Sequence, residues 1–232
     1  MTIELRNSDR LPAPAGFSHA AIAPPGQTVY LAGTIGTDAE GNSKGRQDMN
    51  FDDVSADIES VVLTPEEIAE GIARMAREIE RDFAGETPLL IGVLKGAVMV
   101  MADLARELNI HVEMDWMAVS SYGKSTKSSG VVRIVKDLDI SLEGRHVLIV
   151  EDIVDSGLTL SWLLENFSSR QAASVRVATL LRKPDALSVE VPIDYLGFDI
   201  PNDFMVGYGL DFAEAYRNLR GVGVLKPSVY KD

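Results

Sequence analysis

The chain of 232 residues contains no cysteine. Disulfide bonds, thiolate metal sites and a cysteine nucleophile are therefore excluded, which fits a reducing compartment. Its three histidines, His19, His111 and His146, show no spacing that would close a zinc site. No apolar run approaches the roughly 18 residues of a membrane span, and the first residues lack the basic region and apolar core of a signal peptide. These absences predict a cytoplasmic protein without a membrane partner.

Positive charge is also scarce, because 22 Lys and Arg face 35 Asp and Glu and give a formal net charge of -13. Binding to a phosphate backbone needs a basic footprint, so we expect no nucleic-acid partner. Apolar residues make up 46% of the chain and charged residues 25%. This composition and length predict one α/β domain with a small appendage.

Residues 147–160, VLIVEDIVDSGLTL, form the most informative segment. Four apolar residues, Val147 to Val150, predict a strand buried on both faces of a parallel sheet. Glu151 and Asp152 then fall at its carboxyl end. Ligands of open α/β sheets bind outside such strand ends, so we expect both carboxylates to face a cleft and not the core.

The turn that follows has the features of an anion site. Gly157 lets backbone N–H groups approach an anion, hydroxyls add donors, and a helix from about Leu158 points its positive end at the same place. Carboxylates repel a bound phosphate, so we expect a divalent cation or sugar hydroxyls to lie between them. The alternative is a solvated strand end with Asp155 as a helix cap.

The same segment resembles the phosphoribosyl diphosphate (PRPP) motif of type I phosphoribosyltransferases and is most similar to the hypoxanthine-guanine branch. The resemblance implies a mostly parallel twisted sheet flanked by helices, with a small hood subdomain. It implies that Glu151 and Asp152 hold the ribose hydroxyls and Mg²⁺, and that Asp155 is the candidate base for the purine N7 proton. The residues that it assigns to the 5-phosphate are Asp155, Ser156, Gly157, Leu158 and Thr159. Among these, Leu158 offers no side-chain contact to phosphate.

A second candidate anion site lies at residues 88–108. Residues 88–94 predict a buried strand, Lys95 and Gly96 follow, and a helix is expected from about Val98 to Leu108. A turn glycine beside a surface lysine is the alternative. GVLKGA, however, resembles the pyrophosphate loop of the same family, and this implies a cis peptide bond between Leu94 and Lys95.

The polar segment 120–130, SSYGKSTKSSG, reads as a surface loop. In the resembled family the equivalent loop is a lid that closes over the reacting centre, with Ser121 and Tyr122 at its base. Closure would exclude water from the reaction.

Strands are expected at 175–181, 193–198 and 204–208. The residues that the resemblance assigns to the base and to pyrophosphate lie within or after these strands. It implies that Lys183 donates to the purine 6-oxo group, that Phe204 stacks on the base, and that Met205 reads its edge through backbone atoms. It also places Asp211 near the base and a second Mg²⁺, and Arg217 on pyrophosphate, where its planar fork suits two phosphate oxygens.

The N-terminal part differs in composition from the rest. Residues 1–50 are rich in Gly, Pro, Ala and Asn and contain one strand-like run, Thr28 to Ala32. Residues 10–45 resemble the opening of the reactive-intermediate (imine/enamine) deaminase family, but are too few for its full domain. We expect a short β-rich extension, either a remnant or a hairpin, either docked or flexible. Residues 51–232 form the predicted phosphoribosyltransferase domain, whose first helix starts after Thr64 with a capping box.

The resemblance implies a Mg²⁺-dependent purine salvage enzyme. Hypoxanthine, guanine or both would react with PRPP to give IMP or GMP and pyrophosphate, in a homo-oligomer, a dimer or a tetramer. Two alternatives stay open: a regulatory protein on the same fold that senses nucleotide and binds RNA, and a phosphoribosyltransferase specific for xanthine or a pyrimidine.

Overall fold

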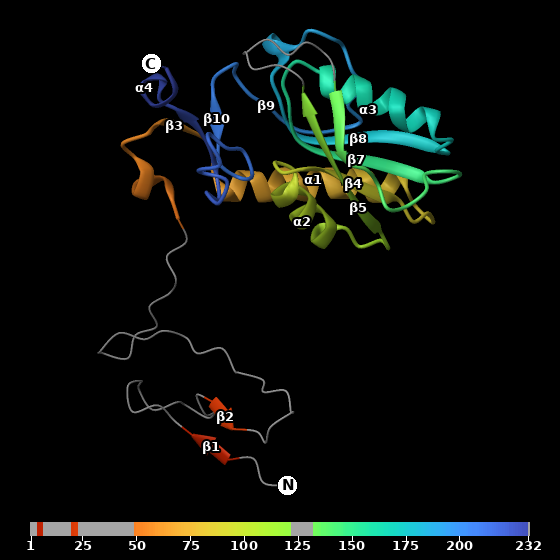
Figure 1. The fold of residues 1–232 in the computed structure, drawn as a ribbon, viewed down its shortest axis with the longest axis horizontal. Coiled ribbons are helices and arrows are strands. Elements are labelled where there is room, and N and C mark those ends of the chain that lie inside the picture. Colours follow the sequence, from red (N-terminus) through yellow and green to blue (C-terminus); the bar gives the residue numbers. More distant parts are fainter. Residues whose placement is uncertain (1–3, 7–19, 23–48, 122–131, 232) are drawn as a thin grey trace. The chain divides into compact units, whose positions relative to one another are not determined.

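The computed structural model describes residues 4–6, 20–22, 49–121 and 132–231 (Figure 1). The chain divides into two units, Met1–Asp48 and Met49–Asp232, close to the boundary predicted after residue 50. In the first unit, β1 (Glu4–Arg6) pairs with β2 (Ala20–Ile22) in antiparallel fashion. The strand expected at Thr28 to Ala32 lies outside the described residues. The deaminase-like character of this unit stays a prediction.

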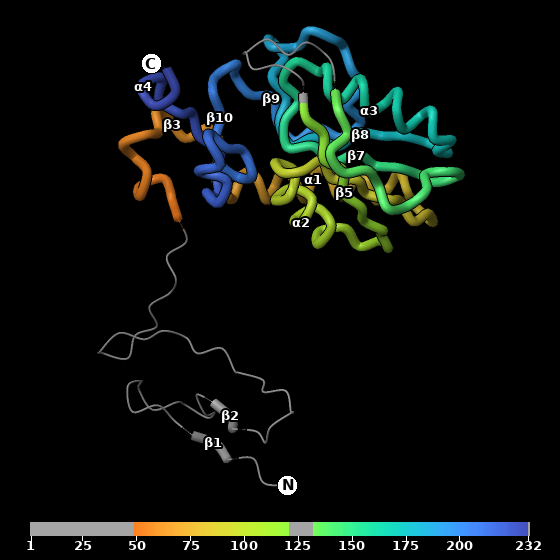
Figure 2. Tube along the Cα trace, in the orientation of Figure 1, coloured from red at the N-terminus to blue at the C-terminus, as the bar shows by residue number. Residues whose placement is uncertain are grey.

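The second unit is built on a sheet whose described strands run in the order β6-β5-β4-β7-β8-β9 (Figures 1 and 2). These strands are β4 (Leu89–Leu94), β5 (Glu113–Ser121), β6 (Val132–Lys136), β7 (His146–Val154), β8 (Ser174–Arg182) and β9 (Tyr195–Asp199). Every neighbouring pair is parallel except β5 with β6. The predicted mostly parallel sheet is thus confirmed.

Helices cover both faces of this sheet, with α1 (Pro65–Asp82) and α2 (Val98–Glu107) on one face and α3 (Leu158–Ser169) on the other (Figure 1). Alternate side chains of β7 pack into two separate hydrophobic cores. Leu148 packs with α1 and α2, whereas Ile149 packs with α3. Both faces of the strand are therefore apolar, which explains its continuous run of Val, Leu and Ile.

Helix α1 begins as the sequence predicts. The Thr64 hydroxyl accepts a hydrogen bond from the Glu67 backbone N–H at 3.2 Å, and Glu67 Oε2 accepts one from the Thr64 N–H at 2.8 Å. The apolar stripe of this helix is fully in the core, at Ile68, Ile72, Met75, Ile79 and the following Phe83. The capping box is confirmed. No described helix is long and apolar enough to span a membrane.

A smaller sheet joins the two ends of the second unit. It has the order β10-β11-β3, from β10 (Met205–Val206), β11 (Val222–Leu225) and β3 (Ile58–Leu63). The short helices η1 (Phe51–Val54) and α4 (Pro227–Tyr230) accompany it. Its core contains Ile58, Val206 and Leu225. Residues 49–63 and 201–231 thus form the hood subdomain that the family resemblance implied, although no sequence pattern predicted β3 or β11.

Two strand boundaries were predicted incorrectly. The strand expected to end at Val150 continues to Val154, so Glu151 and Asp152 lie inside β7 and not after it. The strand expected over 204–208 is only two residues long, because Gly207, Tyr208 and Gly209 all adopt positive φ angles that end it.

Candidate active site

The turn after β7 has the geometry expected of an anion site. Strand β7 ends at Val154, α3 begins at Leu158, and Gly157 between them has φ +79°. A Cβ at Gly157 would lie 2.6 Å from the Val189 carbonyl oxygen, so neither the backbone angle nor the space suits a larger residue. A pocket of about 100 Å³ opens here. Its lining includes Glu151 together with Asp155, Ser156, Gly157 and Thr159. The Leu158 side chain is not part of that lining.

The two acids of β7 serve different sides of the strand. Glu151 lines the turn pocket, whereas Asp152 lies against Gly96, in the loop after β4. Neighbouring side chains of a strand point to opposite faces, which separates them. Glu151 is only 7% exposed, so it meets the turn pocket from a largely buried position.

Burial shapes the charge of both carboxyl groups. It raises the pKa of Glu151 well above its usual value, and the negative charge of Asp152 raises it further. Burial also raises the pKa of Asp152 to about 6. Two desolvated acids on adjacent residues favour a positively charged ligand, since a cation near either one would offset the repulsion between them.

The loop after β4 brings three segments of the chain together. The Leu94–Lys95 peptide bond is cis, as the resemblance predicted. A Cβ at Gly96 would overlap Asp152 Oδ2, and a Cβ at Gly209 would overlap the Gly96 carbonyl oxygen. The end of β4, the middle of β7 and the hood segment at Gly209 are therefore in direct contact, and glycine is needed at both positions.

The residues predicted to bind pyrophosphate lie in one ionic network. Arg217 Nη2 is 2.8 Å from Asp211 Oδ1, and Arg217 Nη1 donates to the Gly209 carbonyl at 2.8 Å. Lys95 Nζ is 3.1 Å from both carboxylate oxygens of Glu214. Glu214 also reaches Arg217 at 3.4 Å. Sequence reasoning missed Glu214, whose only local signal was its position three residues before Arg217.

The residues predicted to contact the base lie beside the turn and in the hood. Lys183 is 7% exposed, and its Nζ is 3.5 Å from Asp155 Oδ2. Met205 is buried in β10, opposite Val224 of β11. Phe204 is 36% exposed and stacks on Tyr230, with ring centroids 4.7 Å apart. Sequence reasoning missed Tyr230, which covers one face of Phe204 and leaves a purine the other face at most.

The lid prediction falls mostly outside the structure. Ser121 is the last residue of β5, while its side chain and Tyr122 lie outside the described residues.

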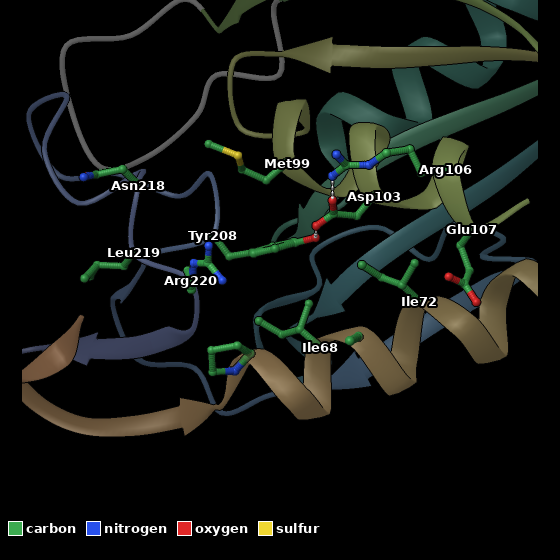
Figure 3. A pocket seen from close by; sticks show the side chains of 12 residues that line it. Ile68, Ile72, Met99, Asp103, Arg106, Glu107, Tyr208, Asn218, Leu219 and Arg220 are labelled. Atoms are coloured by element: carbon green, nitrogen blue, oxygen red, sulfur yellow. Dashed lines mark hydrogen bonds and ion pairs between the residues drawn. The ribbon is translucent and has the colours of Figure 1, made fainter. Parts of the chain in front are cut away.

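A larger pocket of about 620 Å³ lies between α1, α2 and the segment 208–220 (Figure 3). The Tyr208 hydroxyl donates to Asp103 Oδ2 at 2.6 Å, and Arg106 forms an ion pair with the other oxygen of Asp103. Burial and the Asp103 charge raise the pKa of Tyr208, so it stays a neutral donor. None of the predicted site residues lines this pocket.

Comparison with known protein families identifies the class to which this fold belongs. A family model described as phosphoribosyl transferase domain matches residues 62–213, and the chain belongs to this family. The type I fold and the family predicted from sequence are thereby confirmed.

Relatives and solved structures narrow the similarity further. The chain is 61% identical over 182 residues to a hypoxanthine-guanine phosphoribosyltransferase of Mycobacterium avium, covering 76% of this chain and 90% of the relative. It is 53% identical over 176 residues to the Bacillus subtilis protein of the same name, covering 76% and 98%. A crystal structure of a hypoxanthine phosphoribosyltransferase from Staphylococcus aureus superposes with a TM-score of 0.75 at 41% identity, covering 77% of this chain and 97% of that chain.

The family model does not reach residues 10–45. Their resemblance to the deaminase family gains no support and stays a prediction.

The acids of the site fit Mg²⁺ as a ligand shared with substrate. Within the part of the chain that the structure describes, no group of three or more His, Cys, Asp or Glu side chains could hold a metal ion. Mg²⁺ usually takes one or two carboxylates and completes its shell with water and substrate phosphates. Asp152, next to the Lys95 loop, and Glu151, in the turn pocket, can supply such carboxylates.

Proposed function

We propose that this chain transfers the phosphoribosyl group of PRPP to hypoxanthine, guanine or both, releasing pyrophosphate and forming IMP or GMP. The names of the similar bacterial proteins support this purine salvage role. One structural observation carries it: the Lys183 ammonium lies 3.5 Å from the Asp155 carboxylate, at the edge of the turn after β7. This pair would set a donor for a purine oxo group beside an acceptor for a ring proton.

The turn would bind the 5-phosphate. The Ser156 and Thr159 hydroxyls, the backbone around Gly157 and the N-terminus of α3 together form an anion site of the kind found at helix starts. These groups would hold the sugar phosphate. C1 of the ribose would then lie between the residues proposed for the base and those proposed for pyrophosphate. The turn therefore sets the orientation of the substrate.

The leaving pyrophosphate would bind to the Lys95 loop and the hood. Lys95 and Arg217 carry positive charge toward the departing oxygens, and the Gly96 backbone can approach them closely. Glu151 and Asp152 would offer carboxylates to one Mg²⁺ and Asp211 to a second, each ion shared with oxygens of the substrate, and the metal would supply positive charge near the departing pyrophosphate. The same carboxylates hold ribose hydroxyls while positive charge grows on the sugar.

Asp155 is the proposed base. Its carboxylate would accept the proton from N7 of the purine as the new glycosidic bond forms. Lys183 would donate to the 6-oxo group and so select 6-oxopurines, while Phe204 would stack on the ring and Met205 would present backbone atoms to its edge. Ser121 and Tyr122 would close the lid over this assembly.

We further propose a cytoplasmic homo-oligomer, a dimer or a tetramer. Light scattering of the purified protein tests the assembly, because a monomer at micromolar concentration would contradict it.

Incubation with PRPP, Mg²⁺ and each of hypoxanthine, guanine, xanthine, adenine and uracil, with products identified by mass, tests the function. IMP or GMP is the expected product. XMP or UMP alone would favour the xanthine-specific or pyrimidine-specific alternative. Sequence-selective RNA binding with no nucleotide from any base would favour the regulatory alternative.

A further inference from the structure

The two cations proposed for pyrophosphate share one carboxylate that no family motif named. Lys95 Nζ lies 3.1 Å from both oxygens of Glu214, and the Arg217 guanidinium lies 3.4 Å from Glu214 Oε2. Lys95 comes from the loop after β4, whereas Arg217 comes from the hood. Glu214 therefore ties together the two halves of the proposed pyrophosphate subsite.

The backbone of Glu214 is held in a tight loop. Its N–H donates to Asp211 Oδ2 at 2.9 Å, and Phe212 and Ala215 on either side exchange two backbone hydrogen bonds. Glu214 itself has φ +67°, a conformation that side-chain-bearing residues rarely adopt. Such a loop fixes where the Glu214 side chain starts, so that the carboxylate reaches both cations without moving the chain.

The contact is well suited to exchange. The side chains of Lys95 and Glu214 are 65% and 64% exposed, and exposed ion pairs are weak. Pyrophosphate carries several negative charges and can pair with a lysine and an arginine at once. The oxygens of pyrophosphate can therefore replace those of Glu214 as partners of Lys95 and Arg217. Glu214 can pair with both cations again when pyrophosphate leaves.

We propose that Glu214 is a positioning residue of the pyrophosphate subsite. Its carboxylate holds the side chains of Lys95 and Arg217 in place by ion pairs. These ion pairs break when the pyrophosphate group of PRPP binds the two cations, and they form again when the product leaves. This inference rests on the proposed function, since it needs pyrophosphate at Lys95 and Arg217. It predicts that the native carboxylate weakens pyrophosphate binding by competing for these cations.

The variant Glu214→Gln keeps the size of the side chain and removes its charge. We expect it to bind pyrophosphate about two- to fivefold more tightly, the effect of losing one exposed ion-pair competitor. Calorimetric titration with magnesium pyrophosphate measures this directly, without a purine base. Product inhibition by pyrophosphate should strengthen in parallel, while KM for the base stays unchanged.

The matched control is Glu165→Gln on α3, which removes the same charge from an exposed position away from the site. Pyrophosphate affinity in Glu165→Gln should equal that of the native chain. In a Lys95→Met background, Glu214→Gln should increase the pyrophosphate affinity by a smaller factor, because only one of the two cations for which Glu214 and pyrophosphate compete remains. Equal pyrophosphate affinity in Glu214→Gln and Glu165→Gln would overturn the inference while leaving the proposed function intact. Failure of the native chain to bind pyrophosphate would overturn both.

Discussion

The carboxylate of Asp152 occupies the space beside the Gly96 Cα that a Cβ would fill. A residue of β7 is thereby pressed against the loop that follows β4, and the Gly96 carbonyl in turn meets Gly209 of the hood. This stack joins the proposed metal-binding acid to the proposed pyrophosphate loop. Its closeness leaves no room for a side chain at position 96.

Gly96→Ala should therefore lower kcat/KM for PRPP by about 100-fold, because a displacement near 1 Å at a reacting site has effects of that size. Steady-state kinetics with PRPP varied, together with a melting curve, measure the effect. The contrasting variant is Gly85→Ala, where φ is +88° but no atom lies near the added Cβ. It should lower the melting temperature through backbone strain and leave kcat/KM unchanged. Full activity in Gly96→Ala would refute the close packing at this loop.

Lys183→Met should affect the base and not PRPP. Lys183 is almost fully buried beside Asp155, and its proposed partner is the purine oxo group. Loss of a charge-assisted hydrogen bond should reduce kcat/KM for hypoxanthine by about 10- to 100-fold. Initial rates with each substrate varied in turn check this. An unchanged base KM with a raised PRPP KM would place Lys183 on the phosphate side.

Asp155→Asn should abolish proton acceptance while leaving the anion turn in place. We expect kcat to fall by about 100- to 10,000-fold, the usual contribution of a general base. Binding of PRPP, measured by calorimetry, should stay within about twofold, since the backbone and hydroxyl donors of the turn remain. Loss of PRPP binding together with activity would instead show that Asp155 shapes the turn.

Asp115→Asn should reveal a pH-dependent contribution to stability. Burial raises the pKa of Asp115, but hydrogen bonds from the backbone N–H groups of Trp116, Asp139 and Ile140 and the charge of Lys136 outweigh it and lower the pKa overall. The folded pKa lies below the unfolded one, so the stabilisation is present above the unfolded pKa, near 4, and is lost as pH falls through the folded pKa.

At pH 7 the variant should lower the free energy of unfolding by about 1–3 kcal/mol, the effect of disturbing buried hydrogen bonds. Urea denaturation at pH 7, 5 and 3.5 should show the difference from the native chain narrowing toward the lowest pH. Asp203→Asn, at an exposed carboxylate, is the control and should change little. A difference that is constant with pH would mean that Asp115 acts through shape and not through charge.

Thr64→Ala should remove the N-cap of α1 and lower the free energy of unfolding by about 1 kcal/mol. Thermal melting or urea denaturation measures this, and Thr64→Ser should restore most of the loss because it keeps the hydroxyl. Catalytic constants should stay the same in both variants. An equal loss in the serine variant would point to the methyl group and not to the cap.

Some short segments of the chain could be assigned their secondary structure from local sequence alone. In residues 147–160 the apolar run, the glycine and the amphipathic segment are contiguous, so strand, turn and helix follow from local preferences. The capping box of Thr64 and Glu67 was visible for the same reason. The family motifs then placed Lys95, Lys183, Asp211 and Arg217 on the list of site residues.

What no pattern revealed are contacts between residues far apart in the chain. Strand β3 pairs with β11 from the opposite end of the second unit. Tyr230 covers Phe204, and Glu214 reaches Lys95, although single aromatic and acidic residues look alike at any surface position.

The sequence by itself thus determined the strand–turn–helix at the proposed anion site and the residue types that line it, because these depend on residues close by in the chain. Tertiary structure alone decided that Glu151 lies in the turn pocket while Asp152 lies against Gly96, and that Glu214 joins two cations. Alternation along a strand separates two adjacent side chains, but only packing determines what each of them meets.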